Sequence, residues 1–294
     1  MVSHGRRGQR MIMSKLNSTI HPDVWGGRKL AEKYGKGNGL LTRIAESLES
    51  CDTLDRLGLC LKWIDTDFPT SVQVHPQGEN PDKLSYIGEE GNEIWIIVES
   101  EPESRIGIGF IREVSQAEVL EAANHLTLER LLNTIHPNSG DCFVIPHGTV
   151  HYIGGGITAL EWKSRRGRTL RLYDWGRNRM TGRTIQMAES LSIARVRATF
   201  PQRIPLPLET GPVSATPLWD NRTMYFGRHK VDGQVTFSGH GEKFITCLEG
   251  IFSMDGDVLH QGETIHFSGE PEESFPVLQG NGILFETILR EQEA

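Results

Sequence analysis

The sequence predicts a mostly β protein, built as an antiparallel sandwich or barrel. Its 294 residues contain many short apolar or alternating runs, separated by Gly, Pro, Asn and Asp, with 32 glycines in all. This spacing is typical of strands joined by tight turns and not of alternating strands and helices. The runs expected to form strands in the first part of the chain are 57–65, 70–76, 93–100, 105–111, 141–148, 150–155, 157–164 and 169–175.

Two segments interrupt this strand pattern with helical features. In residues 115–135 the apolar side chains recur at helical spacing, and Ser115 with Glu118 resembles a capping box. One or two short helices packed on the β-structure are expected there. Residues 25–35 predict another helix, which ends at Gly35.

The chain divides into two predicted domains. The segment 200–213 is rich in proline, and proline suits neither a helix interior nor a central strand, so it is interpreted as a linker. Residues 17–199 then form the first domain, and residues 214–294, where strand-like runs resume, form a smaller β domain. Residues up to Leu16 are expected to be a loose extension.

The composition excludes several classes of function. A formal net charge of -7 argues against general nucleic-acid binding, which needs a basic face. No run approaches the roughly 18 apolar residues of a membrane-spanning helix, and the basic first residues lack the apolar core of a signal peptide. The four cysteines are scattered without a CxxC pair, as in a protein with reduced thiols. The sequence therefore predicts a cytoplasmic protein with no membrane partner.

A metal site is predicted from the polar face of one strand. Side chains alternate along a strand, so Ser71, Gln73 and His75 share a face. Glu93 opens the next strand, and His151 follows a turn into a third. Two imidazoles, a carboxylate and an amide oxygen suit a divalent ion, most readily zinc, and less selectively manganese, iron, cobalt or nickel.

Spacing alone leaves alternatives to this ligand set. The four residues Gln73, His75, Glu93 and His151 could instead be hydrogen-bonded polar residues at the mouth of a barrel. Three further histidines compete as ligands, since periodicity does not exclude His125, His136 or His147.

Several motifs resemble those of the class I (type I) mannose-6-phosphate isomerases, or phosphomannose isomerases, in their short bacterial form. SVQVHP followed downstream by IPHGTVHYIG is a specific combination, and the order and approximate spacing of the motifs also match. The resemblance is strong from Val24 to Arg177 and loose elsewhere. The matching segments are 24–37, 43–50, 59–76, 91–102, 140–157 and 170–177.

The resemblance implies a cupin-type β-barrel, or jelly roll, with a zinc-dependent aldose–ketose isomerase site in the first domain. The substrates would be mannose 6-phosphate and fructose 6-phosphate, and the family's metal ligands fall at the four positions already selected. The smaller C-terminal domain would be cupin-like. The family's catalytic arginine corresponds to Arg171, an acidic pocket residue to Glu161, the lysine before the metal strand to Lys62, the serine that opens that strand to Ser71, and a basic phosphate contact to Arg177.

The sequence leaves the general base open between two residues. Glu161 lies among apolar neighbours, and burial could raise its pKa toward neutrality. Lys62 is the alternative base, because a desolvated lysine loses its proton more easily. The two could equally form an ion pair that lines the pocket without proton transfer. The basic cluster Lys163, Arg165, Arg166 and Arg168 is expected in a solvated hairpin loop.

One departure from the family pattern concerns the substrate. Most relatives have a lysine two residues before the metal-binding glutamate, where this chain has Gly91, and Lys83 or Arg177 are candidates to compensate. Alternative functions are therefore a metal-binding cupin with another sugar phosphate, a non-catalytic sugar-binding relative, and a cupin oxygenase, against which the absence of an HxH motif argues. The protein is expected to be a monomer or a homodimer.

Overall fold

A computed structural model describes residues 12–36, 43–76, 91–164, 168–204, 214–220, 223–238, 241–268 and 275–290. The chain forms two compact units. The smaller unit comprises Met1–Asn17, Lys33–Gly35 and Pro207–Ala294, and the larger comprises Ser18–Glu32 and Lys36–Leu206. No helix within the described ranges has the length and apolarity needed to cross a membrane.

The larger unit is a jelly roll of two antiparallel sheets. Its seven-stranded sheet has the order β13 (Gln202–Ile204), β9 (Cys142–Pro146), β6 (Gly91–Ser100), β11 (Ile157–Ser164), β4 (Leu59–Thr66), β3 (Glu46–Ser50) and β2 (Asn17–His21). Its five-stranded sheet has the order β12 (Leu170–Tyr173), β5 (Val72–Val74), β10 (His151–Ile153), β7 (Ile106–Phe110) and β8 (Leu132–Ile135).

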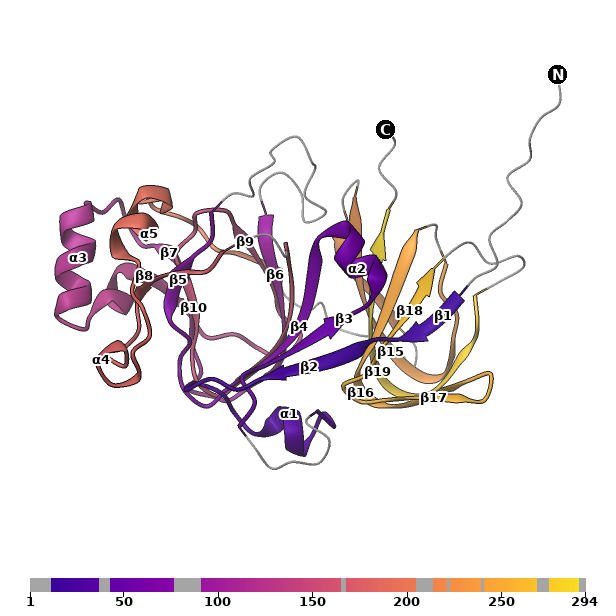
Figure 1. Ribbon diagram of the computed structural model, residues 1–294. Coiled ribbons are helices and arrows are strands. Elements are labelled where there is room, and N and C mark those ends of the chain that lie inside the picture. The colour runs from indigo at the N-terminus through magenta and orange to yellow at the C-terminus, as the bar shows by residue number, and fades with distance from the viewer. Residues whose placement is uncertain are drawn as a thin grey trace, which may run out of the picture. The chain divides into compact units, whose positions relative to one another are not determined.

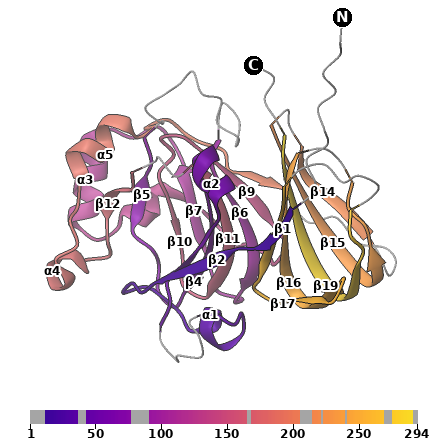
Figure 2. The same ribbon diagram turned by 45° about the vertical axis from the view of Figure 1, so that its right-hand side comes forward.

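Short helices complete this unit. They are α1 (Lys29–Glu32), α2 (Asp52–Leu57), α3 (Gln116–Asn124), the 3-10 turn η1 (Leu128–Leu131), α4 (Asn178–Thr181) and α5 (Met187–Ile193). Figures 1 and 2 show α3 and α5 on the side of the five-stranded sheet that faces away from β6 and β11. The helix expected in residues 115–135 is thus confirmed as α3 and η1, including the capping box of Ser115 and Glu118.

Side chains alternate along β5, so its two faces point into two separate buried layers. Val72 and Val74 pack in an apolar cluster with residues of α3, η1 and α5, on the outer face of the five-stranded sheet. A second cluster, which includes Trp95 and Phe143 from one sheet and Ile108 from the other, fills the space between the sheets. Gln73 therefore faces the interior of the jelly roll, as the strand alternation predicted.

The smaller unit is a sheet with its own apolar core. Its strand order is β1 (Ile12–Lys15), β18 (Thr264–Ser268), β16 (Glu242–Met254), β19 (Leu278–Leu289), β15 (Met224–Val235) and β14 (Ser214–Asp220), and β17 (Asp257–His260) pairs with β16. Phe252, Phe267 and Leu284 are among its buried residues.

Two expectations about connecting segments are corrected. Residues 12–15 do not form a loose extension, since β1 pairs with β18 along Ile12–Lys15. Residues 202–204 of the expected linker form β13, an edge strand that pairs with β9. Pro201 precedes this strand and proline suits an edge, so the pairing is physically permitted. The rest of the Pro-rich segment, 205–213, lies outside the described residues.

Candidate metal centre

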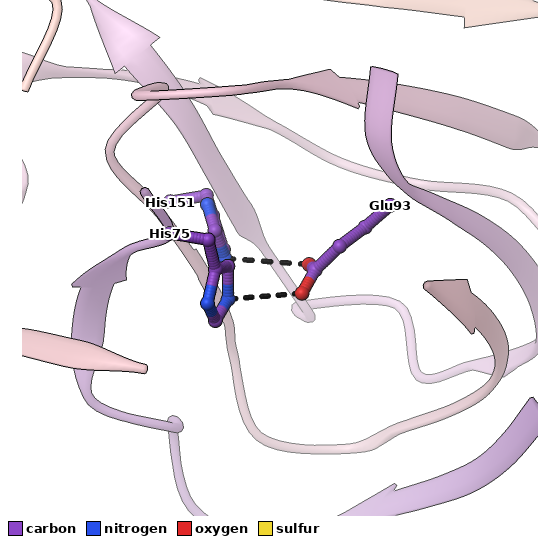
Figure 3. Close-up of side chains that lie close together, drawn as sticks. All are labelled: His75, Glu93 and His151. Carbon is purple, nitrogen blue, oxygen red and sulfur yellow. Dashed lines mark ion pairs between the residues drawn. The ribbon is translucent and has the colours of Figure 1, made fainter. Parts of the chain in front are cut away.

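A buried cluster of His75, Glu93 and His151 lies inside the larger unit. His75 follows β5 directly, Glu93 lies on β6, and His151 begins β10. One ligand atom from each lies within 4.8 Å of the others. The exposed fraction of each side chain is 1% or less. Figure 3 shows both rings turned toward the Glu93 carboxylate. Among the residues that the structure describes, this is the single group of three or more such side chains that could hold a metal ion.

Backbone carbonyls orient the two imidazoles. His75 Nδ1 lies 2.9 Å from the carbonyl oxygen of Arg168, and His151 Nδ1 lies 2.8 Å from that of Thr149. A carbonyl can only accept a hydrogen bond, so in the neutral ring the proton is on Nδ1 and Nε2 carries a lone pair. Such second contacts are usual for histidines that bind metals.

With neutral rings, the atoms that face one another in the cluster favour a cation between them. His75 Nε2 lies 2.9 Å from Glu93 Oε1, and His151 Nε2 lies 3.4 Å from Glu93 Oε2. His75 Nε2 is buried and has no hydrogen-bond partner among the described residues. With both rings neutral, nitrogen lone pairs face carboxylate lone pairs, which is unfavourable unless a positive charge lies between them. The donor set therefore fits a divalent ion.

Electrostatics keep Glu93 and His151 in the form that binds a metal. Burial alone would raise the pKa of Glu93, but His75 and Lys163 outweigh it and hold the pKa well below its usual range. Burial lowers the pKa of His151 to about 4, against the opposing effect of Glu93. At neutral pH the carboxylate is thus ionised and the His151 ring is neutral.

Gln73 and Ser71 lie beside the cluster. Gln73 Nε2 is 3.3 Å from His151 Nε2, and Ser71 Oγ donates a hydrogen bond to Gln73 Oε1 at 3.4 Å. The backbone pairs Gln73 with both His151 and Arg171 on the neighbouring strands. The amide is therefore within reach of the expected ligand set.

A cavity in the larger unit adjoins the cluster and collects most of the predicted site residues. Its lining includes His21, Asp23, Glu46, Lys62, Ser71, Gln73, Trp95, Glu161, Lys163, Arg171 and Arg183. Polar and charged side chains therefore dominate an interior that would otherwise be apolar.

Trp95 connects two carboxylates at the base of this cavity. Its Nε1 donates to Glu93 Oε2 at 3.3 Å and to Glu161 Oε2 at 3.2 Å. Lys62 lies on the other side of Glu161, 3.7 Å from Oε1, and donates to Glu46 at 3.2 Å. Trp95 therefore supports the glutamate of the cluster.

The two candidate bases have different titration behaviour. Burial raises the pKa of Glu161, the charge of Glu93 raises it further, and nearby lysines oppose both effects. Burial lowers the pKa of Lys62, but Glu161 and Glu46 outweigh burial, so the net shift is upward. Lys62 therefore stays protonated at neutral pH, and desolvation does not make it a base in this environment.

The expected position of Lys163 in a solvated loop is wrong. Lys163 lies on β11, and its ammonium donates to Glu93 Oε1 at 3.0 Å. Arg168 is exposed, as expected, and Arg165 and Arg166 lie outside the described residues. The signal that could have placed Lys163 is its spacing from Glu161, because residues two apart on a strand share a face.

The arginines also differ in their surroundings. Arg171 lines the cavity, and its Nε is buried without a hydrogen-bond partner among the described residues. Burial and the nearby Arg183 lower the pKa of Arg171. Arg177 is not among the lining residues, and it pairs with Asp174 at 2.6 Å. Arg183, which no sequence motif singled out, lines the cavity and pairs with Asp23 and Asp174.

The competing histidines do not join the cluster. His125 and His136 are exposed. His147 is half-buried, and burial together with Arg195 lowers its pKa. Lys83, named as a possible substitute for the missing family lysine, lies outside the described residues.

The fold and the site together define a β protein of the cupin jelly-roll type with a buried His–Glu–His cluster suited to a divalent cation. No family model matches the sequence. Mannose-6-phosphate isomerase ManA of Bacillus subtilis is 34% identical over 152 residues, which are 51% of this chain and 47% of that protein. The mannose-6-phosphate isomerase of Streptococcus mutans is 26% identical over 238 residues, covering 69% of this chain and 70% of that protein.

Solved structures extend the likeness to nearly the whole chain. The mannose 6-phosphate isomerase from Bacillus subtilis superposes with a TM-score of 0.75 at 19% identity, over 96% of this chain and all of that one. A Salmonella typhimurium mannose 6-phosphate isomerase, bound to its substrate fructose 6-phosphate and to zinc, gives a TM-score of 0.65 at 17% identity, over 95% of this chain and all of that one. The chain thus resembles the mannose-6-phosphate isomerases in sequence and shares their fold, while its matched part spans about half of the first curated relative.

Proposed function

We propose that this protein is a metal-dependent aldose–ketose isomerase that interconverts mannose 6-phosphate and fructose 6-phosphate. The observation that carries the proposal is the buried cluster of His75, Glu93 and His151 beside a cavity that holds Glu161 and Arg171. The sequence likeness to isomerases of mannose 6-phosphate supports the substrate.

The proposed metal is a single zinc ion held by His75, Glu93, His151 and the amide oxygen of Gln73, which a flip of that amide turns toward His151. Two neutral imidazoles, a carboxylate and an amide oxygen match the nitrogen and oxygen donors that zinc accepts. A bound zinc ion would supply Lewis acidity, which stabilises negative charge on the sugar oxygens by several kcal/mol. The Salmonella typhimurium mannose 6-phosphate isomerase, whose structure contains zinc, supports this choice.

Glu161 is the proposed general base. It would remove the proton from C2 of the aldose, so that the C2–H electron pair forms the C1=C2 bond while the C1=O π pair moves onto O1. The proton of O2 then passes to O1, the C2=O bond forms, and Glu161 returns its proton to C1 to give the ketose. Burial raises its pKa, which brings a carboxylate closer to the basicity this step needs. Lys62 keeps its proton and would hold the Glu161 carboxylate in place across their ion pair.

Arg171 is the proposed clamp for the developing negative charge or for the phosphate. Its guanidinium lines the cavity, and its Nε lacks a hydrogen-bond partner among the described residues, so donors remain for a ligand. Ser71 is buried and lines the same cavity, and beside its hydrogen bond with Gln73 its oxygen remains as an acceptor for a substrate hydroxyl. The phosphate role expected of Arg177 gains no support from its pairing with Asp174.

The test is a direct assay in which zinc-loaded protein is incubated with mannose 6-phosphate and the formation of fructose 6-phosphate is measured. Turnover that chelation abolishes and zinc restores is the expected result. Equal rates with and without chelator would overturn the metal-dependent mechanism. Tight zinc and sugar-phosphate binding without turnover would instead favour a non-catalytic relative, and turnover of another hexose phosphate would keep the reaction but change the substrate.

The remaining proposals concern the surroundings of the enzyme. No disulfide joins the four cysteines, all of which the structure describes, and three of them are buried, as suits a reducing compartment such as the cytoplasm. The site as described is built from residues of one chain, so either a monomer or a homodimer is compatible with it. Sedimentation of the purified protein distinguishes these states.

A further inference from the structure

Lys163 is a buried ammonium at the metal end of the cavity. On β11 it pairs in register with Glu93 on β6, and its Nζ lies 3.0 Å from Glu93 Oε1. Its side chain is 8% exposed, yet it lines the cavity with Glu161 and Arg171. The lysine is therefore enclosed by protein on most sides and open toward the space a substrate would fill.

The hydrogen bonds of this ammonium are incomplete. A lysine carries three N–H donors, and a buried donor without an acceptor costs free energy. Within the described part of the chain, Glu93 is the partner that Lys163 finds. The other lysine of the cavity differs, because Lys62 is placed between Glu46 and Glu161. Lys163 thus retains donors for a ligand.

We propose that Lys163 is a catalytic residue that donates a charge-assisted hydrogen bond to the substrate oxygen that becomes negative as the enediolate forms. This inference rests on the proposed isomerase function. Its geometric basis is that Lys163 contacts Glu93, so its ammonium lies where a sugar's C1 and C2 oxygens would approach the cluster. Lys163 keeps its proton throughout, and no bond to it forms or breaks. Such a bond is worth more to the charged intermediate than to the neutral sugar.

The test compares two ligands that differ in charge at this position. In arabinonate 5-phosphate a carboxylate takes the place of the enediolate, and in arabinitol 5-phosphate a neutral hydroxymethyl group takes the same place. Both are titrated into zinc-loaded wild type and Lys163→Met by calorimetry. We expect the affinity for the aldonate to fall by about tenfold or more, as for a hydrogen bond to a charged group. The affinity for the alditol should fall by less than about threefold, the range of a weak neutral contact.

Two further variants separate this role from a structural one. Lys36 is also buried and pairs with Glu49 at 2.9 Å, but it does not line the cavity. Lys36→Met should therefore lower stability and leave the ratio of the two affinities unchanged. Lys163→Arg keeps a cation and should recover part of the aldonate affinity. The zinc content of every variant is measured, and one zinc per chain is expected.

The possible results test the role of Lys163 separately from the proposed isomerase function. Three results would each overturn the role of Lys163. They are an equal loss of affinity for the two ligands, a loss of zinc from Lys163→Met while wild type remains fully occupied, and no binding of either ligand to wild type. Wild type that binds the aldonate more tightly than Lys163→Met does, but forms no fructose 6-phosphate, would overturn the isomerase proposal and leave this contact standing.

Discussion

At the scale of single residues, the site consists of charges that are buried but paired. Glu93 accepts hydrogen bonds from Lys163 and Trp95. Glu161 accepts a hydrogen bond from Trp95 and forms an ion pair with Lys62. Removal of one partner from such a pair leaves an uncompensated buried charge, which is costly. The lysine beside Glu93 comes from β11 and not from position 91, where the family resemblance would place one.

Glu93→Gln should abolish stoichiometric zinc binding. The amide is a far weaker ligand than the carboxylate, and the change also deprives Lys163 of its partner at a cost of about 3–5 kcal/mol. We expect the zinc affinity to fall by roughly 100-fold or more, measured by competition with a chromophoric chelator. Glu101→Gln, at an exposed carboxylate of the same unit, is the control and should bind zinc normally. Unchanged zinc affinity in Glu93→Gln would contradict the ligand assignment.

Asp65 makes the stability of the larger unit depend on pH. It is fully buried, and burial raises its pKa from 3.8 to about 6, although Leu30 N donates to it. Because the folded pKa exceeds the unfolded one, its contribution is present below about pH 4 and is lost as the pH rises through about 6. A pKa difference of this size between the folded and unfolded states corresponds to about 3 kcal/mol.

Asp65→Asn should remove this dependence. The free energy of unfolding of the variant, minus that of wild type, should increase by up to about 3 kcal/mol between pH 4 and pH 7.5. Denaturant titrations at several pH values, all with chelator present, measure the difference without interference from metal binding. A difference that stays constant over this range would show that Asp65 titrates normally in the folded protein.

At the scale of elements, α3 and α5 cover the outer face of the five-stranded sheet and so leave its inner face to the site. This division starts in β5, where Val72 and Val74 pack toward the helices and Gln73 points inward. A one-residue shift in the register of this strand would exchange the two faces. The packing of the helices therefore helps to fix which side chains reach the cavity.

The capping box of α3 gives a prediction at this scale. Ser115 Oγ accepts a hydrogen bond from Glu118 N at 3.2 Å, and Glu118 Oε2 accepts one from Ser115 N at 2.8 Å. Ser115→Ala should lower the free energy of unfolding by about 1 kcal/mol. Ser115→Thr keeps the hydroxyl and should cost less. Urea unfolding measures both, and equal losses would show that the cap bond contributes little.

At the scale of the whole molecule, two compact units each bury an apolar core, and each contains a cysteine that is 0% exposed. Cys142 lies in the larger unit and Cys247 in the smaller one. Burial raises the pKa of each thiol to about 12. A thiol with such a pKa has almost no reactive thiolate at neutral pH, so its reaction with a labelling reagent reports opening of the structure.

The two cysteines should report on separate opening if the units are independent domains. In native protein at pH 7.5 we expect Cys51, which is half-buried, to react first, and Cys142 and Cys247 to react slowly. Phe252→Ala in the smaller unit should remove about 3–5 kcal/mol of packing, and so accelerate labelling of Cys247 alone. Mass spectrometry of labelled peptides identifies the sites. Equal acceleration at Cys142 would show that the two units open as one cooperative body.

Much of this architecture is determined by local sequence pattern. Turn residues delimit the strands, alternation places Gln73 and His75 opposite Val72 and Val74, and Ser115 begins its helix at the expected position. These features depend on neighbours in the chain, and such short-range preferences are expressed before any tertiary contact forms. The motifs around the two histidines also predicted the family likeness that the comparisons found.

Tertiary structure alone decided which charges meet in the site. Lys163 reaches Glu93 only because β11 pairs with β6 in one register, a contact between residues 70 apart in the chain. The selection of Arg183 for the cavity, and its pairing with Asp23, depend in the same way on how distant segments pack. Local pattern specifies the face on which a side chain lies. Its partners, and therefore its protonation and chemistry, follow from long-range pairing that no single segment encodes.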